Sequence, residues 1–259
     1  MNKEVLPLLA SPSTGVVITG GASGLGFASA RALAAVGRPV AIWDINGQRA
    51  SSAADAIQAE FGTVAVGYGV DVRDPEAIQN AANQTREALP SIGGIVHCAG
   101  IVDVASLDGI TIESWDDGMN IHLRPIVLLL QVFLEDMKRV PGSAMVATSS
   151  INATLGNSMN PVYTAAKGGV LSLVRSLADR LGQEGIRINS ISPGQIMTPM
   201  MKPSIDALEP RHFEKRILLD RIGEPEEIGR VVRFLLSDEA SYITASEIVV
   251  DGGNISSQR

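Results

Sequence analysis

Short runs of hydrophobic, often β-branched residues alternate along the chain with longer amphipathic segments. The runs predict seven strands, at residues 16–19, 39–44, 64–70, 94–97, 145–150, 185–191 and 247–251. Helical patterns lie between them, and no repeat, low-complexity run or linker interrupts the series. This alternation predicts one α/β domain over residues 1–259, of which residues 1–14 form an N-terminal extension. We expect a doubly wound parallel sheet of about seven strands with helices on both faces.

The longest helical pattern runs from Ser114 to Arg139 and contains Pro125, which should kink it. Residues 126–130 are all apolar and would cover every side of the helix. One side can face the sheet, but another needs a cover. The predicted helix from Tyr163 to Leu181 is similar, so we expect a homo-oligomer, a tetramer or a dimer.

Composition removes several classes of function. A net charge of −7 and a pI near 5.0 argue against nucleic-acid binding, which needs clustered Lys and Arg. The single cysteine, Cys98, excludes intramolecular disulfides and Cys-rich zinc sites, and it fits a reducing compartment. His97, His122 and His212 show no metal-ligand spacing, and a core or solvated position is expected for each. We assign no metal site.

No apolar run approaches the ~20 residues of a membrane span. The first residues also lack the pattern of a signal peptide. We therefore expect a cytoplasmic protein with no membrane partner.

Glycines gather directly after the first predicted strand. Gly20, Gly24 and Gly26 stand between that strand and a helix, which is the arrangement that binds a pyrophosphate at a helix N-terminus. Tight turns need glycine for other reasons, so the motif alone is weak evidence. Its place at the first strand-to-helix turn favours dinucleotide binding.

An acid, Asp44, ends the second predicted strand. A carboxylate there can accept both ribose hydroxyls of NAD, and it repels the 2′-phosphate of NADP. Asp44 could instead serve the turn before Asn46 and Gly47, and the nearby Arg49 could bind a phosphate. We favour NAD and keep NADP as the alternative.

Tyr163 and Lys167 lie one helical turn apart, after a strand that ends at Ser150. A cation about 4 Å from the phenol would contribute roughly 4 kcal/mol at an effective dielectric of 20, which is up to ~3 pKa units. Lys167 could thus bring the pKa of Tyr163 near the pH at which an acid–base catalyst works. Ser150 could bind the substrate oxygen that exchanges a proton with Tyr163. An exposed Tyr/Lys pair after a Ser-rich loop is the alternative interpretation.

Residues 195–219 lack a strong predicted element, and we expect a substrate-binding loop there. Met197, Met200 and Met201 suit an adaptable apolar pocket, although methionines that fill core gaps are about as common. Polyols are an alternative class of substrate, because Asn152, Asn157 and Asn160 leave room for one.

With these motifs in order, the sequence resembles the classical short-chain dehydrogenase/reductase family over nearly its whole length. The glycine motif from Thr19 to Gly26 and the Ser150, Tyr163 and Lys167 set carry the resemblance, which implies a Rossmann-type fold. It also implies that Asn120 completes the catalytic set by holding a water that joins Lys167 to solvent. The implied cofactor-binding residues are Gly20, Ser23, Gly24, Leu25, Gly26, Asp44, Asp71, Val72, Ala99, Gly100, Tyr163, Lys167, Pro193, Gly194, Ile196 and Thr198.

The chain departs from the family pattern at two places. His97 and Cys98 stand where the family usually has two asparagines, so we expect cofactor binding to persist with altered packing beneath it. Ala245 stands where a glycine usually follows the threonine, which could shift a subunit contact.

The resulting hypothesis is an NAD-dependent oxidoreductase that transfers a hydride between nicotinamide and a secondary alcohol or ketone. We expect an apolar substrate, such as an alicyclic, aryl or steroid-like alcohol. The alternatives are an NADPH-dependent 3-oxoacyl thioester reductase and a non-catalytic dinucleotide-binding protein.

Overall fold

The computed structural model describes residues 8, 9 and 12–258. The extension predicted over residues 1–14 therefore lies mostly outside the described residues.

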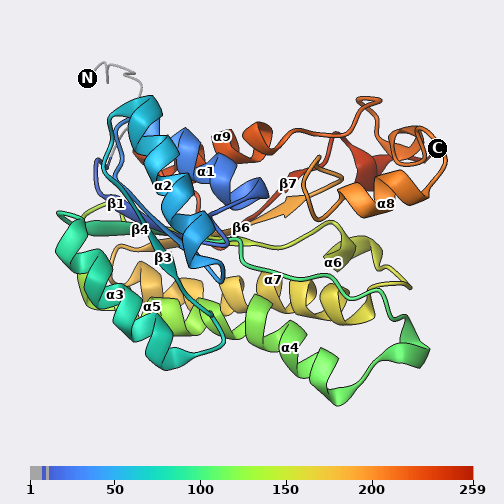
Figure 1. Cartoon of the computed structure of the whole chain (residues 1–259), viewed down its shortest axis with the longest axis horizontal. Helices are drawn as coiled ribbons and strands as arrows, with labels where there is room; N and C mark the ends of the chain where they lie inside the picture. Colours follow the sequence, from blue (N-terminus) through green and yellow to red (C-terminus); the bar gives the residue numbers. More distant parts are fainter. Residues whose placement is uncertain (1–7, 10–11, 259) are drawn as a thin grey trace.

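Seven parallel strands form one sheet, with the order β3-β2-β1-β4-β5-β6-β7 (Figure 1). The order reverses between β1 and β4, which is where such sheets bind ligands. The predicted fold class is confirmed. The strands are β1 (Gly15–Thr19), β2 (Val40–Asp44), β3 (Ala65–Gly69), β4 (Ile92–His97), β5 (Ala144–Thr148), β6 (Arg187–Pro193) and β7 (Glu247–Val250).

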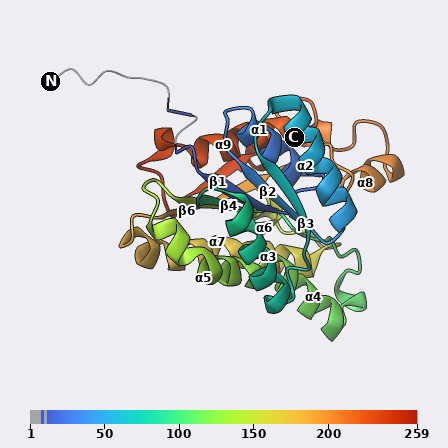
Figure 2. The ribbon, with the colours of Figure 1, turned by 60° about the vertical axis from the view of Figure 1, so that its left-hand side comes forward.

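Helices cover both faces of the sheet, as Figures 1 and 2 show. One layer holds α1 (Gly24–Ala34), α2 (Gly47–Phe61) and α9 (Pro225–Leu235). The other holds α3 (Pro75–Ala88), α5 (Arg124–Lys138) and α7 (Pro161–Gly182), with α4 (Ile112–His122) beside α7. Apolar side chains alternate between the two faces of each strand and build a core on each side. Within the described residues, no helix is long and apolar enough to cross a membrane.

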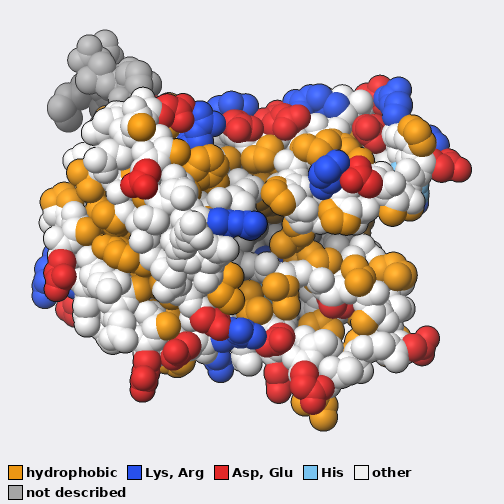
Figure 3. All heavy atoms as spheres, viewed as in Figure 1, with side chains coloured by type: hydrophobic (Ala, Val, Ile, Leu, Met, Phe, Trp, Pro, Cys, Tyr) orange, Lys and Arg blue, Asp and Glu red, His pale blue; other side chains and the backbone are white. Residues whose placement is uncertain are grey.

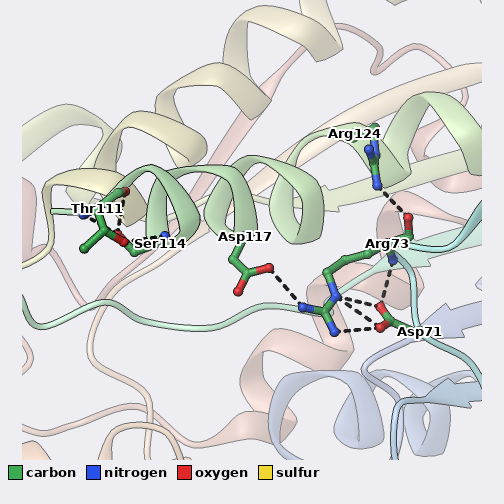
Figure 4. Close-up of polar contacts among 6 residues, drawn as sticks. All are labelled: Asp71, Arg73, Thr111, Ser114, Asp117 and Arg124. Carbon is green, nitrogen blue, oxygen red and sulfur yellow. Dashed lines mark hydrogen bonds and ion pairs between the residues drawn. The ribbon is translucent and has the colours of Figure 1, made fainter.

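Local signals explain where most helices begin. The Asn46 side chain accepts a hydrogen bond from Arg49 N, so Asn46 and Gly47 start α2 instead of forming a separate turn. The Asp74 side chain accepts from Glu76 N and caps α3, with Pro75 in the first turn of the helix. Thr111 and Ser114 cap α4 reciprocally, which Figure 4 shows at its left.

The single helix predicted from Ser114 to Arg139 is wrong. The segment forms α4 and α5, which are separated at Leu123. Pro125 has no N–H to donate to the carbonyl of the preceding turn, and its ring crowds that carbonyl. It therefore divides the segment and stands in the first turn of α5, where its missing donor is tolerated.

The region 195–219 also contains more structure than predicted. It holds the short helix α8 (Lys202–Ala207), with Pro203 in its first turn, and a 3-10 turn at Glu214–Arg216. β6 covers Arg187–Pro193, two residues later at each end than the strand predicted over residues 185–191. The remaining short helical segments are α6 (Asn152–Leu155), Leu107–Gly109, Asp238–Ala240 and Asn254–Ser256.

Ala245 adopts a left-handed backbone with φ of +57°, while its N–H donates to Ile188 O at 2.8 Å. A Cβ in this conformation costs roughly 1–2 kcal/mol, whereas glycine costs about 0.4–1 kcal/mol through the unfolded chain. Ala245→Gly is therefore expected to raise the free energy of unfolding by about 0.5–1 kcal/mol. Urea unfolding measures this, with Ala77→Gly inside α3 as a control that should lower stability. Lower stability in Ala245→Gly would contradict the expectation.

Candidate active site

The predicted site residues follow the carboxyl ends of adjacent strands. The glycine turn follows β1, Ala99 and Gly100 follow β4, and Ser150 lies two residues after β5. Pro193 ends β6 and Gly194 follows it. Parallel strands bring these ends to one edge of the sheet, so four segments distant in sequence meet there.

The backbone of the glycine turn is packed so tightly that Gly20 and Gly26 could not carry side chains. A Cβ on Gly26 would lie 2.2 Å from Gly20 O, and one on Gly20 would lie 2.7 Å from Ala99 N. Gly20 also has φ of +64°. Ser23 is the N-cap of α1 but makes no capping bond with its side chain, and Gly24 and Leu25 form the first turn. The cradle leaves N–H groups of this helix start available for a diphosphate.

Asp44 ends β2 against the glycine turn. Its carboxylate accepts hydrogen bonds from Ala22 N at 3.2 Å and Asn46 N at 3.1 Å. Asp44 therefore does serve the turn, and its negative charge also lies beside the glycine cradle. Arg49 is exposed in the first turn of α2. Asp44 and Arg49 thus offer opposite charges to a group bound near the end of β2.

Arg73 links the loop after β3 to α4 (Figure 4). Its guanidinium donates to both Asp71 oxygens and, at 2.9 Å, to Asp117 on α4. The Arg73 hydrogen bonds hold the pKa of Asp71 below its usual value. Arg124 donates to Arg73 O, and Val72 is buried. Asn120 lies one turn after Asp117 and is partly buried, so the loop with Asp71 and Val72 is tied to the helix that carries Asn120.

His97 and Cys98, which replace the usual asparagine pair, are engaged beneath the site. His97 Nδ1 lies 2.8 Å from Thr19 Oγ1, and its Nε2 lies 3.1 Å from Ile121 O. Cys98 Sγ lies 3.2 Å from Thr148 Oγ1. Burial lowers the pKa of His97 to about 3 and raises that of Cys98, so both side chains are neutral at pH 7. His97 is thus a core histidine that ties β1 and β4 to the end of α4.

The structure brings Ser150, Tyr163 and Lys167 together. Tyr163 is the third residue of α7, and its phenol is hydrogen-bonded to the buried Ser150. Lys167, one turn later, is only 3% exposed. Its Nζ lies 5.5 Å from the Tyr163 ring centre and donates to Thr148 O at 2.6 Å.

The prediction that Lys167 lowers the pKa of Tyr163 is wrong for this geometry. Burial raises the pKa of Tyr163, and the hydrogen bond with Ser150 opposes that effect. The cation points to a backbone carbonyl and makes no bond to the phenol oxygen. Burial also lowers the pKa of Lys167 from 10.5 to about 8.

Sequence reasoning named Asn160 and His122 but did not predict their place beside Tyr163, and it did not single out Asp103. Asp103 Oδ1 accepts from Tyr163 N at 2.8 Å, and Asn160 donates to Asp103 O. The His122 ring packs edge-on against the Tyr163 ring, with ring centres 5.3 Å apart. The Asp103 and His122 contacts join residues far apart in the chain, so local pattern carries no signal for either. Only the Asn160–Pro161 pair, typical of a helix start, was visible in the sequence.

The segment after β6 closes the site from the α1 side. A Cβ on Gly24 would contact the Thr198 side chain at 3.5 Å, and one on Gly194 would lie 2.7 Å from Asp251 Cβ. Ile196 is buried and forms a bridge with Gly223. Pro193, Gly194, Ile196 and Thr198 therefore lie on one continuous segment that reaches the start of α1.

Exposed apolar side chains occur on the loops around this edge. Figure 3 shows a hollow near the middle of this face, with hydrophobic side chains above and below it on the right. Such clusters on a surface mark binding sites more often than isolated apolar residues do. The exposed residues on the neighbouring loops are Val102, Val104, Leu107, Leu155, Met159, Met197, Met200 and Leu208.

No group of three or more histidine, cysteine and acidic side chains in the described ranges is arranged to hold a metal ion. The polar groups brought together at this edge are the Tyr163 phenol, the Ser150 hydroxyl and the Lys167 ammonium.

Comparison with known proteins gives consistent matches over almost the whole chain. A family model described as "Enoyl-(Acyl carrier protein) reductase" matches residues 20–254. The chain is 38% identical over 251 residues to levodione reductase of Leifsonia aquatica, covering 92% of each protein. It is 33% identical over 245 residues to a probable galactose dehydrogenase of Rhizobium meliloti, covering 92% of this chain and 94% of that protein.

A solved structure similar to this chain is that of L-sorbose reductase from Gluconobacter frateurii, complexed with NADPH and L-sorbose. It has a TM-score of 0.87 and 26% sequence identity, over 93% of this chain and 96% of that one.

Proposed function

Because this chain belongs to the classical short-chain dehydrogenase/reductase family of oxidoreductases, we propose that it is an NAD-dependent alcohol dehydrogenase or ketoreductase. Its substrate is a secondary alcohol or the corresponding ketone. The observation that carries the proposal is the cluster of Ser150, Tyr163 and Lys167 at the sheet edge, beside a tightly packed glycine turn that starts a helix.

The residues at this edge fit a nicotinamide dinucleotide. The cradle formed by Gly20, Gly24 and Gly26 accepts the diphosphate, and Asp44 accepts the adenosine ribose hydroxyls. Tyr163 and Lys167 lie where the nicotinamide ribose is expected. The other proposed cofactor contacts are Ser23, Leu25, Asp71, Val72, Ala99, Gly100, Pro193, Gly194, Ile196 and Thr198. When bound, the cofactor supplies or accepts the hydride.

The protein's own residues handle the substrate proton. Tyr163 takes the hydroxyl proton during oxidation and returns it during reduction, while Ser150 donates a hydrogen bond to the same substrate oxygen. Lys167, one turn later on the same helix, binds the nicotinamide ribose in this proposal. Asn120 supports the path of the proton to solvent.

The preference for NAD is proposed to rest on the Asp44 charge. Asp44→Ser is expected to shift the ratio of kcat/KM for NAD over NADP by about tenfold or more towards NADP, since each 1.4 kcal/mol is tenfold. Steady-state kinetics with both cofactors measure this ratio. Asp55→Ser, which removes an exposed charge on α2, is the control. An unchanged ratio in Asp44→Ser would contradict the assignment and favour a phosphate contact by Arg49.

We infer an apolar substrate from the exposed aliphatic and methionine side chains around the site. A sugar or polyol is the second candidate, favoured by the names of the galactose and sorbose enzymes among the similar proteins. Two of the three asparagines that kept a polyol open already have partners, since Asn160 donates to Asp103 O and Asn157 accepts from Met159 N.

The test is nicotinamide reduction with NAD and NADP over alicyclic, aryl, steroid and sugar secondary alcohols. Turnover that depends on NAD with the alicyclic or aryl members supports the proposal. Turnover with sugars only would assign the second candidate.

Two other functions remain as rivals. An NADPH-dependent 3-oxoacyl thioester reductase is consistent with the acyl-carrier wording of the family model, but Asp44 opposes NADPH. Turnover of an acyl thioester with NADPH only would favour that rival. A non-catalytic dinucleotide-binding protein would bind NAD tightly and give no turnover with any substrate class.

We further propose a single-domain cytoplasmic protein that forms a homo-oligomer, a tetramer or a dimer. Several apolar residues of α5 and α7 are only partly buried and suit a subunit contact: Val127, Leu128, Leu134, Leu173 and Leu177. Light scattering at several protein concentrations measures the mass in solution, and a monomer at all of them would contradict the proposal.

A further inference from the structure

His122 lies at the end of α4 and is only 1% exposed. Its ring stands at 86° to the Tyr163 ring, with the ring centres 5.3 Å apart. Edge-to-face packing of this kind is directional and restricts both rings. The phenol that we assign as the acid–base group is therefore held on one side by an imidazole.

The same imidazole holds the backbone after β4. His122 Nε2 lies 2.8 Å from Ile101 O and 3.2 Å from Ile101 N, so this nitrogen can bond the Ile101 backbone in either neutral tautomer. The ring also fills the space beside Gly100, where a Cβ would lie 2.5 Å from His122 Cε1. Gly100 and Ile101 are thus fixed by one side chain, directly after the strand that enters the cofactor site.

The segment held by His122 returns to Tyr163 at its other end. Two residues after Ile101, Asp103 Oδ1 accepts from Tyr163 N. The backbone from Gly100 to Asp103 and the first turn of α7 therefore form one unit. His122 closes this unit from the side of α4.

A histidine that only fills the core would be expected to satisfy both ring nitrogens. Here Nδ1 is buried and has no hydrogen-bond partner within the described part of the chain. Burial and the Lys167 charge hold the pKa of His122 far below its usual value, so the ring is neutral and cannot serve as a general acid at pH 7. An apolar side chain would fill this volume without leaving a buried nitrogen unpaired.

We propose that His122 is a positioning residue that sets the Tyr163 ring and the Gly100–Ile101 backbone relative to each other. The proposal rests on the function proposed above, because it assigns Tyr163 as the acid–base group and Gly100 as a cofactor contact. The contact between the His122 and Tyr163 rings serves turnover, and the hydrogen bond to Ile101 serves cofactor binding.

Two substitutions separate these contacts. His122→Gln keeps a donor that can reach Ile101 O but loses the ring, so kcat is expected to fall about tenfold with little change in the Kd for NAD. His122→Phe keeps the ring contact but loses the hydrogen bond, so the Kd for NAD is expected to rise about fivefold with a smaller change in kcat. Ile57→Val, a buried change in α2, controls for general loss of stability.

A parallel loss of kcat and NAD affinity in both variants, tracking their melting temperatures, would overturn the proposal. No change in either quantity would also overturn it.

One readout does not require turnover. The chain has three tyrosines, so the double substitution Tyr68→Phe/Tyr242→Phe leaves Tyr163 as the remaining tyrosine. Phenolate absorbance then follows the ionisation of Tyr163. In this background, His122→Gln should move the Tyr163 midpoint towards the ordinary value of about 10, while His122→Phe should leave it in place. If no substrate is ever turned over, the proposed function fails, yet this titration and the Kd for NAD still decide the role of His122. An unmoved midpoint in His122→Gln would overturn that role.

Discussion

Tyr163→Phe is expected to reduce kcat by about 10²–10⁴-fold, because the substitution removes the group proposed to exchange a proton with the substrate oxygen. The Kd for NAD should change by less than about twofold, since only one hydroxyl and no charge is lost. The phenol is buried and hydrogen-bonded to Ser150, so its loss leaves the glycine cradle and Asp44 untouched. Single-turnover kinetics and a fluorescence titration with NADH measure the two quantities.

The matched control for this substitution is Tyr242→Phe, because Tyr242 is fully exposed on a surface turn. It removes the same hydroxyl far from the sheet edge and should leave both quantities unchanged. Retained turnover in Tyr163→Phe would show that another group moves the proton. Loss of NAD binding together with turnover would show that the variant has lost the fold of the site instead.

Lys167→Met is expected to abolish most of the turnover and to make the protein more stable at pH 7. The ammonium is 3% exposed, and burial lowers its pKa from 10.5 to about 8. A difference of that size corresponds to about 3 kcal/mol of destabilisation while the group is charged. The lost hydrogen bond to Thr148 O offsets part of the gain, so about 1–2 kcal/mol should remain.

The sign of this effect depends on pH. Below pH 8 the lysine is protonated in both the folded and unfolded states, and the destabilisation is fully present. Between pH 8 and 10.5 the unfolded state holds more protons, so the stability of the unmodified protein rises with pH and the advantage of Lys167→Met disappears. Urea unfolding at pH 7 and pH 10 measures the difference, with the exposed Lys215→Met as control. Equal gains at both pH values would contradict a buried, charged lysine.

Hydrophobic periodicity was sufficient to predict the fold because the signals are local. Each strand is a short apolar run, and capping residues such as Asp74 mark where helices begin. The helix predicted through Pro125 was wrong because periodicity does not reveal whether proline kinks a helix or divides it. α8 was missed because its six residues are too short to show a period.

The candidate site was predictable in its residue types and less so in its electrostatics. The motif spacing brought Ser150, Tyr163 and Lys167 together correctly, yet the pKa of Tyr163 was predicted in the wrong direction. Burial depth and the orientation of Lys167 towards Thr148 O decide that direction, and neither is encoded in spacing. The places of His122 and Asp103 beside Tyr163 were missed for a related reason, since tertiary packing alone brings them there.

The strand order has a consequence for how this protein becomes able to bind its cofactor. β1 and β4 are neighbours in the sheet, but β2, β3 and three helices lie between them in the chain. Such pairings close long loops, so they form late in folding. The cradle needs Gly20 against Ala99 and is complete only after that closure. NAD should therefore slow unfolding of the assembled sheet without accelerating its assembly, and a fragment that ends before β4 should not retain the dinucleotide.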